Sequence, residues 1–130
     1  MLMKVAIPQW NGRVSPVFDV AGSLLLVDVA DGQELRREEG TLTASDPLQR
    51  AKEVAQFEAE VLICGAISLP LEAALAFTGV QVIPFTCGRV EDVLAAFIDG
   101  RLEQGAFWMP GCRGRRRQFR ARRRRGRAWR

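Results

Sequence analysis

The fold is decided by a stretch in the middle of the chain, Val61-Leu62-Ile63-Cys64-Gly65-Ala66-Ile67-Ser68. Its first four residues form a continuous apolar run, which is typical of a strand covered on both faces. A helix is expected from about Leu69 to just before Gly79, because glycine commonly ends helices. A strand, a loop and a helix in this order form the repeating unit of α/β folds with parallel strands.

An apolar strand is also expected near the start of the chain, over residues 2–7, where Pro8 closes it. Residues 9–16 are expected to form a loop. The pair Asp31-Gly32 then indicates a hairpin, since this pair is favoured in two-residue turns. The second arm is polar enough to be an edge strand. The two arms are residues 24–29 and 34–38.

Two more helices are indicated by start signals and periodicity. The first has Asp46 as its N-cap, Pro47 at its first helical position and Gln49 in reach of a capping box. Its apolar face is expected to hold Leu48, Ala51, Val54 and Ala55. A strand over residues 80–84 precedes the last helix, which Gly100 ends. Apolar residues of that helix occupy positions 90, 93, 94, 97 and 98, the spacing of an amphipathic helix. The alternation predicts an α/β fold with a mixed, mostly parallel sheet, an N-terminal hairpin and flanking helices.

The composition fits one domain with a charged appendage. The chain has 130 residues, 48% of them hydrophobic, which is sufficient for a single core. Eleven arginines and no acids occur from Arg113 onward, whereas eight Lys/Arg and fifteen Asp/Glu precede it. We therefore expect an α/β domain over residues 1–108 and a disordered arginine-rich tail over residues 109–130.

The tail allows more than one role. Its arginines, interleaved with Phe119 and Trp129, can bind phosphates and stack on bases, which predicts weak, salt-sensitive nucleic-acid binding without sequence preference. A solvated, disordered extension is the plainer alternative. Docking on the acidic body of another copy is a third.

The sequence also indicates the compartment. No apolar run approaches the roughly 20 residues needed to span a bilayer, and no stretch resembles a signal peptide, so no membrane is expected and the protein should be cytoplasmic. Three cysteines do not suggest the disulfide framework of a small secreted domain. Free thiols or metal ligands are expected instead.

The candidate site follows from the predicted topology. In open α/β sheets, ligands bind beyond the carboxyl ends of the parallel strands, which selects residues 9–16, 64–68 and 86–89. Cys64 and Cys87 each follow a strand and precede a helix, where partial positive charge favours a thiolate that could bind a metal. Gly65 and Gly88 follow them and would let backbone N–H groups approach an anionic ligand or a cluster. The alternative for Cys64 is the role of a small buried hydrophobe.

Four further residues are candidates with alternatives. Cys112 lies past the last helix, where it could fold back as a third metal ligand or have a free, conditional role. Asn11 and Ser15 could hydrogen-bond a ligand, although Asn-Gly and Ser-Pro are also ordinary turn formers. Asp19 could face the site or cap a short helical turn.

Several functional classes are disfavoured by what the sequence lacks. It has no histidine, no CxxC zinc spacing, and no glycine-rich nucleotide-binding motif. The expected first strand has no Asp or Glu, which argues against a two-metal nuclease. We therefore do not expect an enzyme.

The segments Met3 to Pro8, Val14 to Asp19 and Val61 to Ser68 resemble the dinitrogenase iron-molybdenum cofactor biosynthesis family, as in NifX-like proteins and NifB C-terminal domains. The resemblance runs over roughly residues 3–103. It implies a ribonuclease H-like three-layer α/β fold that binds or carries iron-sulfur or iron-molybdenum cluster precursors without catalysis. It also implies a cluster donor or acceptor protein as partner. One departure is Val17, because many members place a histidine after this Ser-Pro.

Overall fold

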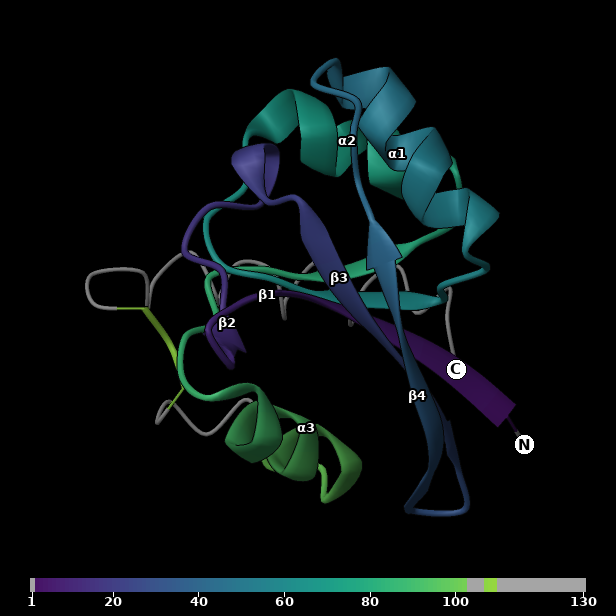
Figure 1. Ribbon diagram of the computed structural model, residues 1–130, viewed down its shortest axis with the longest axis vertical. Coiled ribbons are helices and arrows are strands. Elements are labelled where there is room, and N and C mark those ends of the chain that lie inside the picture. The colour runs from purple at the N-terminus through teal and green to yellow at the C-terminus, as the bar shows by residue number, and fades with distance from the viewer. Residues whose placement is uncertain (1, 103–106, 110–130) are drawn as a thin grey trace, which may run out of the picture.

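The computed structural model describes residues 2–102 and 107–109 (Figure 1). Within these residues a six-stranded mixed sheet is combined with three α-helices and one short 3₁₀ helix, which confirms the α/β class. The strands are β1 (Leu2–Trp10), β2 (Arg13–Val14), β3 (Ser23–Ala30), β4 (Gln33–Thr41), β5 (Val61–Ile63) and β6 (Gln81–Ile83). The helices are η1 (Phe18–Val20), α1 (Pro47–Gln56), α2 (Leu69–Phe77) and α3 (Val90–Ile98).

The strand order is β4-β3-β1-β5-β6, with β2 paired to β1 outside this path. The pairings β1–β2, β1–β3 and β3–β4 are antiparallel, whereas β1–β5 and β5–β6 are parallel. The sheet is therefore mixed, but the prediction that it is mostly parallel is wrong. Three of the five pairings between described strands are antiparallel, and two of these involve the long strands β3 and β4, of 8 and 9 residues, whereas the parallel strands β5 and β6 have only 3 residues each.

The first strand is longer than predicted. Pro8 does not close β1, because it remains in register with Leu24 and its carbonyl accepts a hydrogen bond from Ser15 N at 2.9 Å. Asn11 and Gly12 then form a tight turn with φ of 53° and 78°, and β2 folds back on β1. Residues 9–16 thus contain a second hairpin where a loop was expected. Asn-Gly is the same kind of turn signal that correctly predicted the hairpin between β3 and β4.

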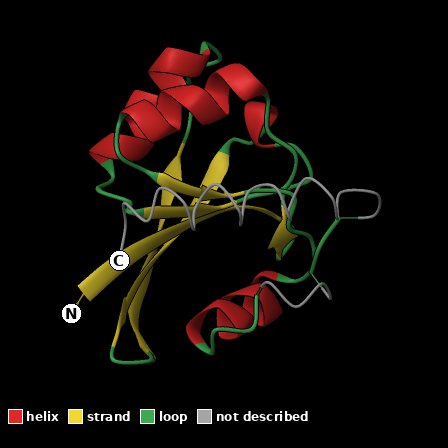
Figure 2. Cartoon of the chain, turned by 180° about the vertical axis from the view of Figure 1, so that it is seen from behind, coloured by secondary structure: helices red, strands yellow, loops and turns green. Residues whose placement is uncertain are grey.

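Helices cover both faces of the sheet and make three layers (Figure 2). One face packs against α1 and α2, in a cluster that includes Ala6, Leu62, Val54 and Leu71. The other face packs against α3, in a cluster that includes Ile7, Ile63, Val90 and Leu94. Neighbouring residues of β1 and β5 therefore point into different clusters, as expected for central strands buried on both faces.

The predicted helix boundaries are largely confirmed. Asp46 caps α1 through a hydrogen bond from Gln49 N at 3.2 Å, and Gly100, with φ of 77°, follows α3. The apolar face of α1 was partly wrong, because Leu48 is 48% exposed while Arg50 is only 4% exposed. Within the described residues, no helix has the length and apolar content needed to cross a membrane.

Candidate functional site at the strand ends

The three predicted site segments, residues 9–16, 64–68 and 86–89, lie together at the carboxyl ends of β1, β5 and β6. We call this part of the molecule the strand-end edge. Backbone hydrogen bonds join each segment to the other two. These bonds are Val14 N to Gly88 O (2.9 Å), Ala66 N to Pro16 O (2.8 Å) and Thr86 N to Cys64 O (2.9 Å). The structure therefore brings together three segments that are far apart in sequence and that the topology rule had selected.

Gly65 lies where the second segment crosses the first. A Cβ atom at this position would lie 2.5 Å from Pro16 O and 2.7 Å from Ser15 O, closer than side-chain carbons approach backbone oxygens. Ser15 is itself buried. Gly65 and Ser15 are therefore brought together by a backbone crossing, which is a close approach that requires glycine.

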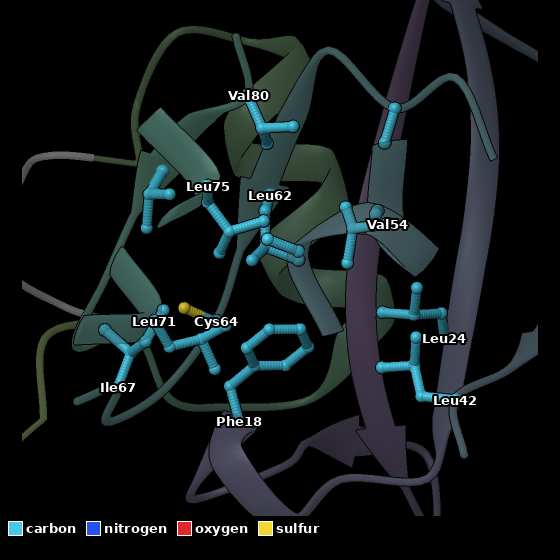
Figure 3. Close-up of a cluster of buried hydrophobic side chains, with 14 of the residues drawn as sticks. Phe18, Leu24, Leu42, Val54, Leu62, Cys64, Ile67, Leu71, Leu75 and Val80 are labelled. Carbon is cyan, nitrogen blue, oxygen red and sulfur yellow. The ribbon is translucent and has the colours of Figure 1, made fainter. Parts of the chain in front are cut away.

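Cys64 lies in the hydrophobic core beneath α2. Its side chain is fully buried in the same cluster as Phe18, Ile67 and Leu71, and the thiol points in among them (Figure 3). The thiol forms no disulfide with a described residue. This is the environment of a cysteine that packs as a small hydrophobe.

Cys87 has different surroundings. It is half-buried, its N donates to Phe107 O at 2.7 Å, and its thiol donates to Trp108 O at 3.6 Å. A β-bridge between Thr86 and Trp108 continues this pairing. Residues 107–109 thus return to the strand-end edge and cover one side of Cys87, which the sequence did not reveal.

The remaining predicted residues divide by position. Gly88 has φ of 127°, a conformation that favours glycine, and its carbonyl holds Val14 N. Asn11 is exposed at the tip of the β1–β2 turn, with the left-handed φ expected of a turn former. Cys112 and the arginine-rich tail from residue 110 onward lie outside the described residues.

Asp19 is a site-building residue whose partner the sequence did not predict. Its carboxylate accepts hydrogen bonds from Ser68 N at 2.9 Å and from Ser68 Oγ at 2.6 Å. Ser68 Oγ in turn accepts from Leu71 N at 3.4 Å, as the N-cap of α2. Asp19 therefore ties η1 to the start of α2, across 49 residues of sequence. Of the two expected roles for Asp19, capping of a short helical turn is not seen, because η1 has no side-chain cap and Asp19 instead holds Ser68, the N-cap of α2.

Arg50 of α1 anchors the segment that contains η1. Its guanidinium donates to the carbonyl oxygens of Ala44 at 2.6 Å, Phe18 at 2.8 Å and Ala21 at 2.5 Å, and lies 5.2 Å from the centre of the Phe18 ring. Burial lowers the pKa of Arg50, an effect that the negative charges of Glu53 and Asp19 oppose. Nothing in the sequence around this charged residue of α1 indicates that its side chain points inward.

The chemistry available at the strand-end edge is limited. Within the described ranges, no three histidine, cysteine or acidic side chains come together as a metal site. Cys87 offers one thiol there, surrounded by backbone groups. A soft metal bound at this edge would take one ligand from Cys87 and further ligands from elsewhere.

Comparison with solved structures places the fold among known proteins. The protein PH0822 is 24% identical over 76% of this chain and 93% of its own, with a TM-score of 0.71. The apo form of the orange protein from Desulfovibrio gigas is 24% identical over 76% and 89%, with a TM-score of 0.65. At this identity the likeness establishes a shared fold.

A third structure has a name that bears on function. It is a Thermotoga protein described as NifB-like and of the DUF35 family, 25% identical over 76% of this chain and 90% of its own, with a TM-score of 0.58. A comparison with curated protein sequences finds no match. The family model named dinitrogenase iron-molybdenum cofactor matches residues 1–100, and the chain therefore belongs to this family.

Proposed function

We propose that the protein binds and carries a metal-sulfur cluster or a cluster precursor, of the iron-sulfur or iron-molybdenum type, at its strand-end edge. Membership of the dinitrogenase iron-molybdenum cofactor family supports this function. The likeness to a NifB-like protein supports it further. The implied partners are a protein that donates the cluster and one that accepts it.

The observation that carries the proposal is the position of Cys87. This half-buried thiol follows β6 and lies three residues before α3, at the edge where α/β folds bind ligands. A thiolate is the soft ligand that iron-sulfur clusters take from proteins. The N-terminus of α3 contributes partial positive charge, which favours an anionic cluster.

The other cysteines have different roles in this proposal. Cys64 packs in the core, because its thiol is fully buried among apolar side chains. Cys112 is a conditional ligand that would join Cys87 when a cluster is bound. Gly88, Asn11 and Ser15 shape the backbone around the ligand.

We further propose that the protein is not catalytic. The sequence contains no histidine, and β1 has no Asp or Glu to support two-metal hydrolysis. We also propose that the three-layer fold is ribonuclease H-like. This proposal concerns the ancestry of the fold and does not imply the chemistry of a nuclease.

Anaerobic reconstitution of the full chain with ferrous iron and sulfide tests the proposal. After desalting, we expect bound iron and visible sulfur-to-iron charge-transfer absorption. Cys87→Ser should lose most of both signals, whereas the matched variant Cys64→Ala should keep them and lose stability instead. A folded wild-type protein with a featureless spectrum would refute cluster carriage, and a fully loaded Cys87→Ser variant would refute the assigned ligand.

A further inference from the structure

Two arginines face each other at the strand-end edge. Arg13 of β2 and Arg89, the residue before α3, form an isolated antiparallel bridge. The flanking hydrogen bonds run from Val14 N to Gly88 O and from Val90 N to Gly12 O, both at 2.9 Å. This pattern makes Arg13 and Arg89 a non-hydrogen-bonded pair, the kind in which directly opposed side chains come closest, with Cα atoms about 4.5 Å apart.

Both side chains point outward. Val14 and Val90 are buried in the α3 cluster, so their neighbours Arg13 and Arg89 lie on the opposite, exposed face. Trp10 is the cross-strand partner of Arg13 on the other side and is 67% exposed. Directly opposed residues of adjacent strands share one face. Trp10, Arg13 and Arg89 therefore form a row, which we call the arginine face.

Among the described residues, no carboxylate forms an ion pair that would offset the repulsion between these two arginines. Like charges directly opposite each other destabilise a pair of strands. The domain before Arg113 has eight Lys/Arg and fifteen Asp/Glu, so acidic partners are plentiful. Four of the eight cations lie in ion pairs and Arg50 is buried on carbonyl groups. The paired cations are Lys4, Arg36, Arg37 and Arg101.

Arg13 and Arg89 thus lack an ion pair with any described carboxylate. Glu91 lies two residues from Arg89 in the chain, yet both of its carboxylate oxygens accept hydrogen bonds from Arg37, at 2.8 and 3.0 Å. Glu91 is therefore already paired with Arg37 of β4. Apart from the cation that is buried on carbonyl groups, three of the eight cations before Arg113 form no ion pair with a described residue. Two of these, Arg13 and Arg89, stand face to face, and the third, Lys52, lies on α1.

We propose that the arginine face is an anion-binding site for a multiply charged inorganic anion, with Arg13 and Arg89 sharing its charge and Trp10 forming an apolar wall. That this anion is a metal-sulfur cluster or its precursor rests on the proposed function. Two guanidinium groups supply up to ten N–H donors and retain their charge at any physiological pH. The uncapped N-terminus of α3, directly after Arg89, adds positive potential.

Molybdate binding to the full-length protein, measured by equilibrium dialysis at low salt, tests this site. The double variant Arg13→Gln/Arg89→Gln should bind molybdate roughly tenfold or more weakly than the wild type, because charge-assisted hydrogen bonds are lost. The matched control, Arg122→Gln/Arg123→Gln, removes the same charge from the tail and should retain the tight site. Equal affinity in the two double variants would overturn the proposal, whether both bind as tightly as wild type or both bind weakly.

Folding and ligand identity are separated by two additional measurements. Circular dichroism verifies the fold, and Arg13→Lys/Arg89→Lys, which keeps both charges, should recover part of the affinity. If the folded lysine double variant binds molybdate no better than the glutamine double variant, and the tail control also binds weakly, no local site exists. Reconstitution with iron and sulfide tests the proposed function separately. Weaker molybdate binding by Arg13→Gln/Arg89→Gln than by the tail control, without cluster absorption in the wild type, would refute the proposed function and leave the anion site standing. Cluster absorption in the wild type, with equal molybdate binding by the two double variants, would refute the anion site and leave the proposed function standing.

Discussion

Gly65→Ala is the substitution that most sharply probes how the strand-end edge is built. The added Cβ would meet two backbone oxygens, at 2.5 Å from Pro16 O and 2.7 Å from Ser15 O. Neither can move freely, because Ser15 N is bonded to Pro8 O and Pro16 O accepts from Ala66 N. Relief of the clash must therefore break a hydrogen bond or distort the crossing.

The magnitude follows from the contacts. Overpacking against parts that cannot yield costs about 1–3 kcal/mol, and a lost backbone hydrogen bond about 1 kcal/mol. Replacing glycine by alanine returns about 0.4–1 kcal/mol by restricting the unfolded chain. The free energy of unfolding should thus fall by about 2–3 kcal/mol, which moves the urea midpoint down by roughly 1–2 M for a domain of this size.

The assay is urea denaturation followed by circular dichroism and tryptophan fluorescence. Gly22→Ala is the matched control, since a Cβ there has its nearest contact at 4.0 Å and Gly22 is exposed without a positive φ. Gly22→Ala should leave the midpoint unchanged or raise it slightly. A Gly65→Ala variant as stable as Gly22→Ala would refute the close crossing of the two loops.

Three further predictions concern the anchors and the tail. Arg50→Met should lower the free energy of unfolding by about 2–4 kcal/mol in urea denaturation, because two buried carbonyl groups and one part-buried carbonyl group lose a charged donor; an unchanged midpoint would contradict this. Arg37 lowers the pKa of Glu34 and of Glu91 chiefly through side-chain hydrogen bonds, so its contribution is present at neutral pH and lost as pH falls through the depressed values. Arg37→Gln should therefore flatten the acid side of the stability profile, by less than about 1 kcal/mol because the groups are exposed, and an equally steep profile would count against it. A chain ending at Gly111 should lose RNA affinity at low salt in filter binding, and the loss should shrink as salt rises; equal binding by both chains would exclude the tail as the contact.

Local sequence patterns predicted the elements well and the pairing less well. Asp31-Gly32, Asp46-Pro47 and the spacing of α3 each depend on neighbouring residues, and each is confirmed. The partners of a strand depend on distant residues, so the antiparallel share of the sheet was underestimated. The β1–β2 hairpin is different, because Asn11-Gly12 is itself a local hairpin signal within a segment expected to form a loop.

The strand-end edge was predictable in outline, because the ends of parallel strands meet whatever their sequence. Its internal contacts were not. The bond from Asp19 to Ser68, the inward guanidinium of Arg50 and the return of Trp108 to Thr86 all join distant parts of the chain. Like-charge pairing of Arg13 with Arg89 emerges only from strand register, which composition and periodicity do not encode.

Paramagnetic broadening in a ¹H–¹⁵N correlation spectrum tests the central claim, that a cluster binds at the strand-end edge, most directly. An iron-containing cluster broadens nearby amide signals, so Gly12, Gly65 and Gly88 should lose intensity when the protein is loaded anaerobically. Gly32, in the β3–β4 turn beside the start of β1, and Gly79, before β6, mark the opposite end and should keep theirs. Uniform broadening, or broadening centred on Gly32 and Gly79, would contradict the account.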